Sequence, residues 1–354
     1  MATITKTIGT TSRDYSTISA WESDLGDTSI YASGDDAAGD CYADSVFTEN
    51  VNISGSFDLS SITLTAAFPD RHDGTAGSGV VIKPSGTASY LLSAGESNTT
   101  VSFIEMNGND SAYLGFSSDA SETGIVFRNN LVHNFGSSSD ASTDVYIMKN
   151  NNSVTFMNNF VFNNTSGSSA DLFVHHSSVS YTTLIYNNTY YYNNVGDNSS
   201  NDGYIFYGTL NNASSVAKNI IVLRYDDSYW NDKHESATLA YWGAVGAITG
   251  VSNVTTDTYG NAFLDTSTSD PDLHLKTGTN FIDAAVDLGT SPTNVEIDIN
   301  GNNRDTGGVT WDLGAHEFGL SPPSAGGKKI KPDTRFNLFH GVEGFGAFST
   351  HYNF

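Results

Sequence analysis

The residue types best suited to chemistry lie together in RYDDSYWNDKH, residues 224–234. Paired carboxylates, or a carboxylate with a histidine, can supply the acid and the base of glycoside hydrolysis. Aromatic rings and guanidinium groups can bind sugars without cleaving them. The segment offers the acid–base candidates Asp226, Asp227 and His234, and the sugar-binding candidates Arg224, Tyr229 and Trp230.

A surface loop on an acidic protein would have the same composition, so the segment alone assigns no catalytic residue. A lyase acting on uronates would also be expected to present several cations, and the whole chain has only 15 Lys and Arg. We therefore expect a non-enzymatic protein. The alternative is a polysaccharide depolymerase, a glycosidase or a lyase, whose site would include the candidates above.

Metal chemistry has one candidate, the segment DINGNNRD at 298–305. Asp298, Asn300 and Asn302 stand at alternate positions, like the beginning of a Ca²⁺ loop. The sixth position, Asn303, is not Gly and the twelfth, Val309, is not Glu, so the EF-hand pattern fails. We expect a polar turn and no cofactor, with Ca²⁺ as the alternative. The single cysteine, Cys41, excludes a disulfide framework and a CxxC zinc site.

The element that must position any site is a repeat built on paired asparagines. The phrases GIVFRNNLVHNF, SVTFMNNFVFNN and TTLIYNNTYYYN place their second asparagines, Asn130, Asn159 and Asn188, at a period of 29 residues. Asn107 and Asn219 extend the series with spacings of 23 and 31. A period of this size signals a repeat architecture. Apolar–polar alternation on both sides of an asparagine predicts two short strands that meet at a corner.

We therefore predict an all-β fold, a right-handed parallel β-helix of about ten coils, in which the five asparagines form a stacked amide ladder. The column two residues after these asparagines is apolar but should face outward by strict alternation. This predicts a lateral contact, such as a trimer axis, a capsid surface or a covering loop. Its members are Val132, Val161, Tyr190 and Ile221. The next column, in which we expect internal aromatic packing, is His133, Phe162, Tyr191 and Val222.

Four regions follow from these patterns. Residues 1–39 form an N-terminal cap, in which Tyr15, Ile18, Trp21 and Leu25 predict a short helix with Asp14 or Ser16 as its N-cap. Residues 40–319 form the β-helix, and residues 320–332 have the composition of a linker. Residues 333–354 form an aromatic tail that docks on its own solenoid, a sister subunit or a partner particle. The tail's assembly candidates are Phe336, Phe339, Phe345 and Phe348.

Charge restricts the partners of the chain. The net charge is −24, and such a surface repels nucleic acid and anionic lipid. We find no membrane-length apolar run and no signal peptide, although the polar, Tyr-rich surface is typical of an extracellular protein. A virus protein released by host lysis would satisfy both observations.

The repeat phrases resemble those of the parallel β-helix repeat proteins, a superfamily that includes pectate lyases and phage tailspikes. The segment 281–319 is similar to the closing motif of many bacterial and phage β-helix proteins. The opening TITKTIGTTSRDYSTISAWESDL resembles the start of β-helix proteins carried by phages. The closing motif matches at Asp283, Asp298, Gly301, Asn302, Arg304, Asp312, Gly314, Ala315 and Glu317, whereas Ala285 and Asn300 depart from it.

This resemblance implies a phage virion surface protein, either a capsid decoration or a short tail spike or fibre. Its implied partners are capsid or tail proteins and further copies of itself, for example in a trimer. A host surface glycan is a further implied partner, and Tyr190 is then a binding candidate. The resemblance implies neither nucleic acid binding nor membrane insertion. It transfers no catalytic residue, since β-helices carry many unrelated functions. A host-receptor-binding protein remains an alternative beside the depolymerase.

Overall fold

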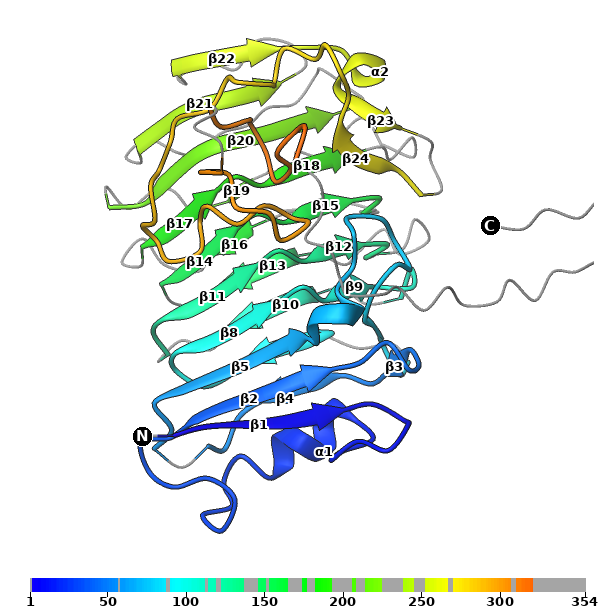
Figure 1. The fold of residues 1–354 in the computed structure, drawn as a ribbon, viewed down its shortest axis with the longest axis vertical. Coiled ribbons are helices and arrows are strands. Elements are labelled where there is room, and N and C mark those ends of the chain that lie inside the picture. The colour runs from blue at the N-terminus through cyan, green and yellow to red at the C-terminus, as the bar shows by residue number, and fades with distance from the viewer. Residues whose placement is uncertain are drawn as a thin grey trace, which may run out of the picture. The chain divides into compact units, whose positions relative to one another are not determined.

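The computed structural model describes residues 2–320 apart from 57, 87–89, 112–113, 119–121, 137–145, 151–152, 165–173, 177–181, 193–205, 208–213, 225–237, 245–251, 267–269 and 307–309. Nearly all regular structure in these residues is β, and almost every strand pairs in parallel with the strand one coil away. The predicted fold class, an all-β parallel β-helix, is confirmed (Figure 1).

Three rows of parallel strands make the solenoid. The first row is β1 (Thr3–Ile8), β2 (Asp36–Cys41), β5 (Ser61–Ala66), β8 (Thr99–Ser102), β11 (Ile125–Arg128), β14 (Val154–Met157), β17 (Thr183–Tyr186), β20 (Val216–Arg224), β21 (Thr238–Ala244) and β22 (Ser252–Thr256). The second row is β3 (Phe47–Thr48), β6 (Val81–Lys83), β9 (Glu105–Asn107), β12 (Leu131–His133), β15 (Phe160–Phe162) and β18 (Thr189–Tyr192). The third row is β4 (Val51–Ile53), β7 (Leu92–Ala94), β10 (Leu114–Ser118), β13 (Tyr146–Asn150), β16 (Val174–His176) and β19 (Phe206–Tyr207).

The number of coils is lower than predicted. Five successive coils, which begin at β2, β5, β8, β11 and β14, pair with the next coil along all three strands. The long strand β20 then continues both the first and the second row, and β21 and β22 follow it. The prediction of about ten coils over residues 40–319 is wrong because the last part of that range leaves the stack.

The interior of the solenoid is filled by aligned apolar side chains. Alternation in the first row turns every second residue inward, so Phe127 lies over Phe156, which pairs with Ile185 in the next coil. The ring centroids of Phe127 and Phe156 are 6.1 Å apart, and Phe116 from the third row packs 4.7 Å from Phe127. These residues belong to one continuous buried core.

The first coil is covered by helix α1 (Ile18–Ser23), as predicted. Its residues Ile18 and Trp21 are fully buried, and the Trp21 indole N–H donates to the Tyr31 hydroxyl at 3.0 Å. The N-cap is Thr17, whose hydroxyl accepts the Ala20 N–H at 3.1 Å. The predicted N-caps are wrong: Asp14 accepts from the backbone N–H of Thr7 in strand β1 and is thereby held away from the helix.

Residues 257–320, here called the strap, run over the outside of the solenoid after β22 (Figure 1, yellow to orange). The strap begins with helix α2 (Tyr259–Ala262) and the antiparallel pair β23 (Phe263–Asp265) and β24 (Asp272–Leu275). A short 3₁₀ turn, η1 (Phe68–Asp70), lies in the connection between β5 and β6. Neither α-helix in the described residues is long and apolar enough to cross a membrane.

Candidate functional site

The first asparagine of each pair holds the strap. Asn129, Asn158 and Asn187 have φ values of 55°, 56° and 52°, in the left-handed region where asparagine is tolerated better than most residues. This conformation makes the corner between the first and second rows. The side-chain N–H₂ group of Asn129 donates to the Asp298 carbonyl at 2.6 Å, and that of Asn187 donates to the Val295 carbonyl at 2.9 Å.

The second asparagine of each pair forms the predicted ladder. Asn159 Oδ1 accepts the backbone N–H of Asn130 at 2.9 Å, and Asn188 Oδ1 accepts that of Asn159 at the same distance. The Asn159 Nδ2 group donates to Asn188 Oδ1 at 2.9 Å. All three side chains are fully buried. The ladder is therefore a scaffold in which each amide satisfies the backbone of a neighbouring coil.

Two members of the predicted ladder are wrong. Asn219 has a φ of 57° and donates to Asn187 Oδ1 at 2.9 Å, so it stands in the first column. Its amide also exchanges hydrogen bonds with the backbone of Val286 in the strap, at 2.8 and 3.1 Å. Asn107 pairs with His133 instead, and Ile104 donates its N–H to Asn130 Oδ1. The spacings of 31 and 23 residues show that these coils differ in length from the 29-residue coils. Asparagines separated by such coils therefore do not occupy equivalent positions in the stack.

The apolar column predicted to face outward is also wrong. Val132, Val161 and Tyr190 are fully buried in the main core. The left-handed corner residue resets the alternation, so the side chains that face outward stand one position away. These are Leu131, Phe160, Phe162 and Tyr191. Ile221, the fourth member of the predicted column, does face outward, because it pairs with Thr189 and not with Tyr190.

The outward apolar column is covered by the chain's own strap, one of the three covers expected for such a column. Its residues share a buried cluster with strap residues that include Phe263, Leu275, Phe281, Trp311 and Leu313. The Tyr191 and Phe263 rings meet edge to face at 6.2 Å, and Ala315 N–H donates to the Thr189 hydroxyl at 3.0 Å. Gly314, with φ +81°, fits where a Cβ atom would lie 2.4 Å from that hydroxyl.

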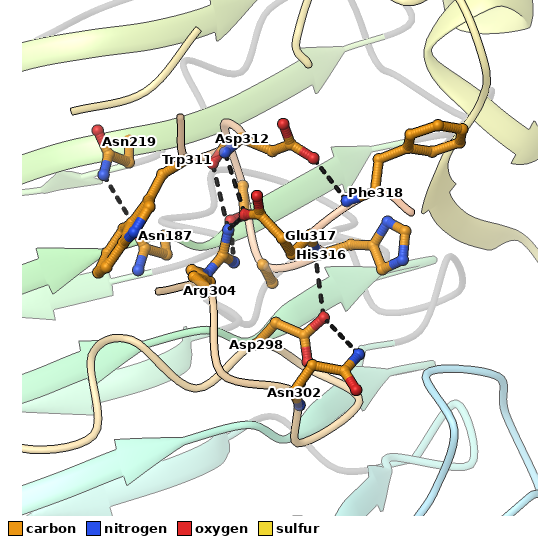
Figure 2. Close-up of polar contacts among 12 residues, drawn as sticks. Asn187, Asn219, Asp298, Asn302, Arg304, Trp311, Asp312, His316, Glu317 and Phe318 are labelled. Atoms are coloured by element: carbon orange, nitrogen blue, oxygen red, sulfur yellow. Dashed lines mark hydrogen bonds and ion pairs between the residues drawn. The ribbon is translucent and has the colours of Figure 1, made fainter. Parts of the chain in front are cut away.

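The matched residues of the closing motif form a buried polar network within the strap (Figure 2). Arg304 is fully buried, pairs with Glu317 at 2.7 Å and donates to the Gly314 carbonyl at 2.8 Å. Asp298 accepts the backbone N–H groups of Asn302 and Glu317. These contacts close the strap's turns around an isolated bridge, Ile297–Asn303, so side chains of these types take the place of a strand ladder.

The carboxylates of this network are unsuited to hydrolysis. Burial raises the pKa of Glu317 to about 7, although Arg304 opposes the shift, and burial also raises the pKa of Asp312. A raised carboxyl pKa is typical of a general acid. However, both side chains are about 1% exposed, and Asp312 accepts the backbone N–H groups of Asp283 and Phe318. A substrate has no access to either group.

A second cluster of titratable groups lies where the strap crosses β15. His274 Nδ1 pairs with Asp272 and Nε2 faces Asn300 Oδ1 at 3.0 Å. Burial lowers the pKa of His274, but its hydrogen bonds to Asp272 and Asn300 outweigh this, and the net shift is upward. His316 packs edge to face on His274 at 4.6 Å, and its Nδ1 accepts the Leu275 N–H.

This His–Asp pair has the form of a base with its orienting carboxylate, but an amide oxygen stands where a nucleophile would be needed. Burial lowers the pKa of His316 to about 2, so that ring is a neutral acceptor.

A third histidine, His133, pairs with Glu105 at 3.0 Å and stacks on Phe162 at 4.7 Å. The prediction of internal packing for this column is wrong: Phe162 and Tyr191 face outward beneath the strap, and Val222 pairs with Tyr190 in the main core. Among the described residues, no group of three His, Cys, Asp or Glu side chains is placed to hold a metal ion.

The remaining candidates lie outside the residues whose side chains the structure describes. Strand β20 includes the backbone of Arg224 only. The other members of this group are Asp226, Asp227, Tyr229, Trp230, His234 and the tail residues Phe336, Phe339, Phe345 and Phe348. The boundaries predicted at 320–332 and 333–354 likewise fall there, from residue 321 on. Asp298 and Asn302, predicted to lie in a polar turn, hydrogen-bond to each other.

Searches against protein-family models and against curated proteins found no match for this chain.

Proposed function

We propose that this chain is a non-enzymatic structural protein displayed on the surface of a phage particle, either as a capsid decoration or as a short tail spike or fibre. The observation that carries the proposal is the engagement of the buried acid and histidine groups in the described residues. Asp298, Asp312 and Glu317 each accept hydrogen bonds from the strap itself. His274 is held between Asp272 and Asn300. These groups build the scaffold: Asp298, Asp312 and Glu317 are buried, and the partly exposed His274–Asp272 pair has an amide oxygen, not a nucleophile, as its further neighbour.

The cover of the solenoid supports the same role. The strap seals the outward apolar column, so that this column is unavailable as a trimer axis or as a capsid contact. Assembly with capsid proteins, tail proteins or further copies is therefore assigned to other surfaces, of which the aromatic tail at 333–354 is our candidate. The strongly negative charge favours a protein that stays soluble at the high local concentration of a particle surface.

Two measurements test the proposal. A density map of purified particles should show the solenoid in many copies over the head for a decoration, or in three or six copies at the tail for a spike. Absence of the protein from the particle would overturn the structural role.

The enzymatic alternative is tested by incubating the protein with host capsular polysaccharide or lipopolysaccharide and sizing the products. We expect no shortening of either polymer. If cleavage occurs and is lost in Asp226→Asn or Asp227→Asn, the depolymerase replaces our proposal. Binding of the uncut polymer would instead favour a receptor-binding protein.

A further inference from the structure

Among the described residues, two arginines lack the carboxylate partners that other arginines of this acidic chain have. Arg13 pairs with Asp44 at 3.0 Å and Arg304 pairs with Glu317 at 2.7 Å. Arg71, just after η1, and Arg128, at the end of β11, have no carboxylate oxygen within salt-bridge distance among the described residues. The chain has 39 acidic residues against 15 basic ones, so unpaired neighbouring cations need an explanation.

Both guanidinium groups lie beside one ring. The Arg71 Cζ atom is 4.0 Å from the centroid of Phe103, and that of Arg128 is 5.8 Å from the same centroid. Phe103 is buried and has a φ of 56°, in the corner column of the asparagines, so the solenoid fixes the ring beside which both guanidinium groups lie. The two charges converge although 56 residues separate them in the chain.

Most of the donors at this place have no acceptor within the described part of the protein. Arg71 donates from Nε to the Ala66 carbonyl at a long 3.5 Å, and Arg128 donates from Nη1 to Asn129 Oδ1 at 3.0 Å. Both residues are partly exposed, and none of their guanidinium nitrogens is a fully buried atom without a partner. A planar guanidinium presents its donors in a fork that matches the oxygens of a carboxylate or a phosphate.

The electrostatics also leave the pair incompletely compensated. Burial lowers the pKa of Arg71, and burial together with the charge of Arg71 lowers the pKa of Arg128 to about 10. Asp40 and Glu296 act on the two arginines from a distance and oppose these shifts. An oxyanion placed between the guanidinium groups would relieve their mutual repulsion.

The surroundings favour a sugar as the carrier of that oxyanion. Phe68 in η1 is 50% exposed, and the Arg71 Cζ atom lies 5.6 Å from its ring centroid. An exposed ring of this kind can pack against the face of a sugar.

We propose that Arg71 and Arg128 form a binding site for an anionic sugar, whose carboxylate or phosphate group lies between the two guanidinium groups and whose ring packs on Phe68. The site does not depend on the structural particle role, and binding of a host glycan at it would favour the receptor-binding alternative. It gives the scaffold a local cationic contact for an acidic surface glycan despite the overall negative charge.

The test is isothermal titration of the full chain with D-glucuronate and D-glucose 1-phosphate, with neutral D-glucose and inorganic phosphate for comparison. We expect the charged sugars to bind at least tenfold more tightly than glucose. Whichever of the two charged sugars binds better identifies the oxyanion. Arg71→Gln and Arg128→Gln should each weaken that binding by about tenfold or more, the size expected for losing a charge-assisted hydrogen bond. Phe68→Ala should weaken the sugars but not inorganic phosphate.

The matched control is Arg13→Gln, which removes an arginine that already has its carboxylate and should leave the affinities unchanged. Circular dichroism checks the fold of each variant. If the Gln variants fail to fold, Arg71→Lys and Arg128→Lys keep the charge but lose the fork, and these should bind more weakly than the wild type. The proposal is overturned if the wild type binds glucose as tightly as the charged sugars, if it binds neither charged sugar, or if the arginine variants bind like the wild type.

Discussion

Replacing Asn159 by alanine tests whether the buried amide ladder stabilises the solenoid. Asn159 Oδ1 accepts the Asn130 backbone N–H at 2.9 Å, and its Nδ2 group donates to the Phe127 carbonyl at 3.1 Å and to Asn188 Oδ1 at 2.9 Å. The site is fully buried, so water cannot replace the lost partners. Each hydrogen bond contributes about 1 kcal/mol net, and the orphaned Asn130 N–H adds a penalty of about 1–3 kcal/mol. Asn159→Ala should therefore lower the free energy of unfolding by about 4–6 kcal/mol.

The measurement is urea unfolding followed by circular dichroism, with the shift in midpoint converted at an unchanged slope. The control is Asn52→Ala, because Asn52 is exposed on β4 and its side chain donates to Ser54 at 3.2 Å on the surface. That substitution should change the free energy by no more than about 0.5 kcal/mol. Equal midpoint shifts in the two variants would refute the reasoning, since the buried amide would then contribute no more than an exposed one.

Three further predictions concern the strap, the histidines and the tail. Gly314→Ala should lower the urea midpoint more than Gly278→Ala, because both glycines have positive φ but only a Cβ atom at Gly314 meets the solenoid, at 2.4 Å; equal shifts would mean that the strap does not press on this face. Acidification should destabilise the protein, because burial lowers the pKa of His316 to about 2, whereas an unfolded histidine takes up a proton below about pH 6.5. The contribution of His316 to the free energy of unfolding is thus fully present above about pH 6.5 and falls by up to about 1.4 kcal/mol per pH unit below it. His316→Gln should reduce this slope between pH 6.5 and 5. An unchanged slope would contradict the conclusion that His316 is buried in its neutral form. Deletion of residues 321–354 should leave a protein with unchanged circular dichroism that no longer enters particles, and incorporation at the wild-type level would exclude the tail as the attachment element.

The period of 29 residues was enough to predict the fold and the inner ladder. Asn130, Asn159 and Asn188 lie in coils of equal length, so their spacing in the chain is also their spacing in the stack. The same rule failed at Asn107 and Asn219, where the intervening coils are shorter or longer. Propensity gave the capping helix but not its first residue, since the contact between Asp14 and β1 is not local to the helix.

The first asparagine of each pair could not be understood from local pattern alone. The pattern shows a residue suited to a left-handed corner, but the acceptors of its amide are strap carbonyls 108–169 residues away, as at Asn187 and Asn129. The closing motif was recognised from its residues, yet its position over the second row was not. For the same reason, the local pattern could not decide whether a trimer axis, a capsid surface or a covering loop lies over the outward apolar column.

Sequence by itself determined the features that depend on neighbours in the chain: the strands, the asparagine corners and the internal ladder. Alternation and hydrogen-bonding capacity are local properties, and a regular repeat carries them from coil to coil. The tertiary structure alone decided which side of each strand faces the interior, because one left-handed residue resets the alternation. It also decided what covers the outer column, and it brought Arg71 beside Arg128 over one phenylalanine. Those outcomes depend on packing between segments distant in the chain, and local sequence carries no record of that packing.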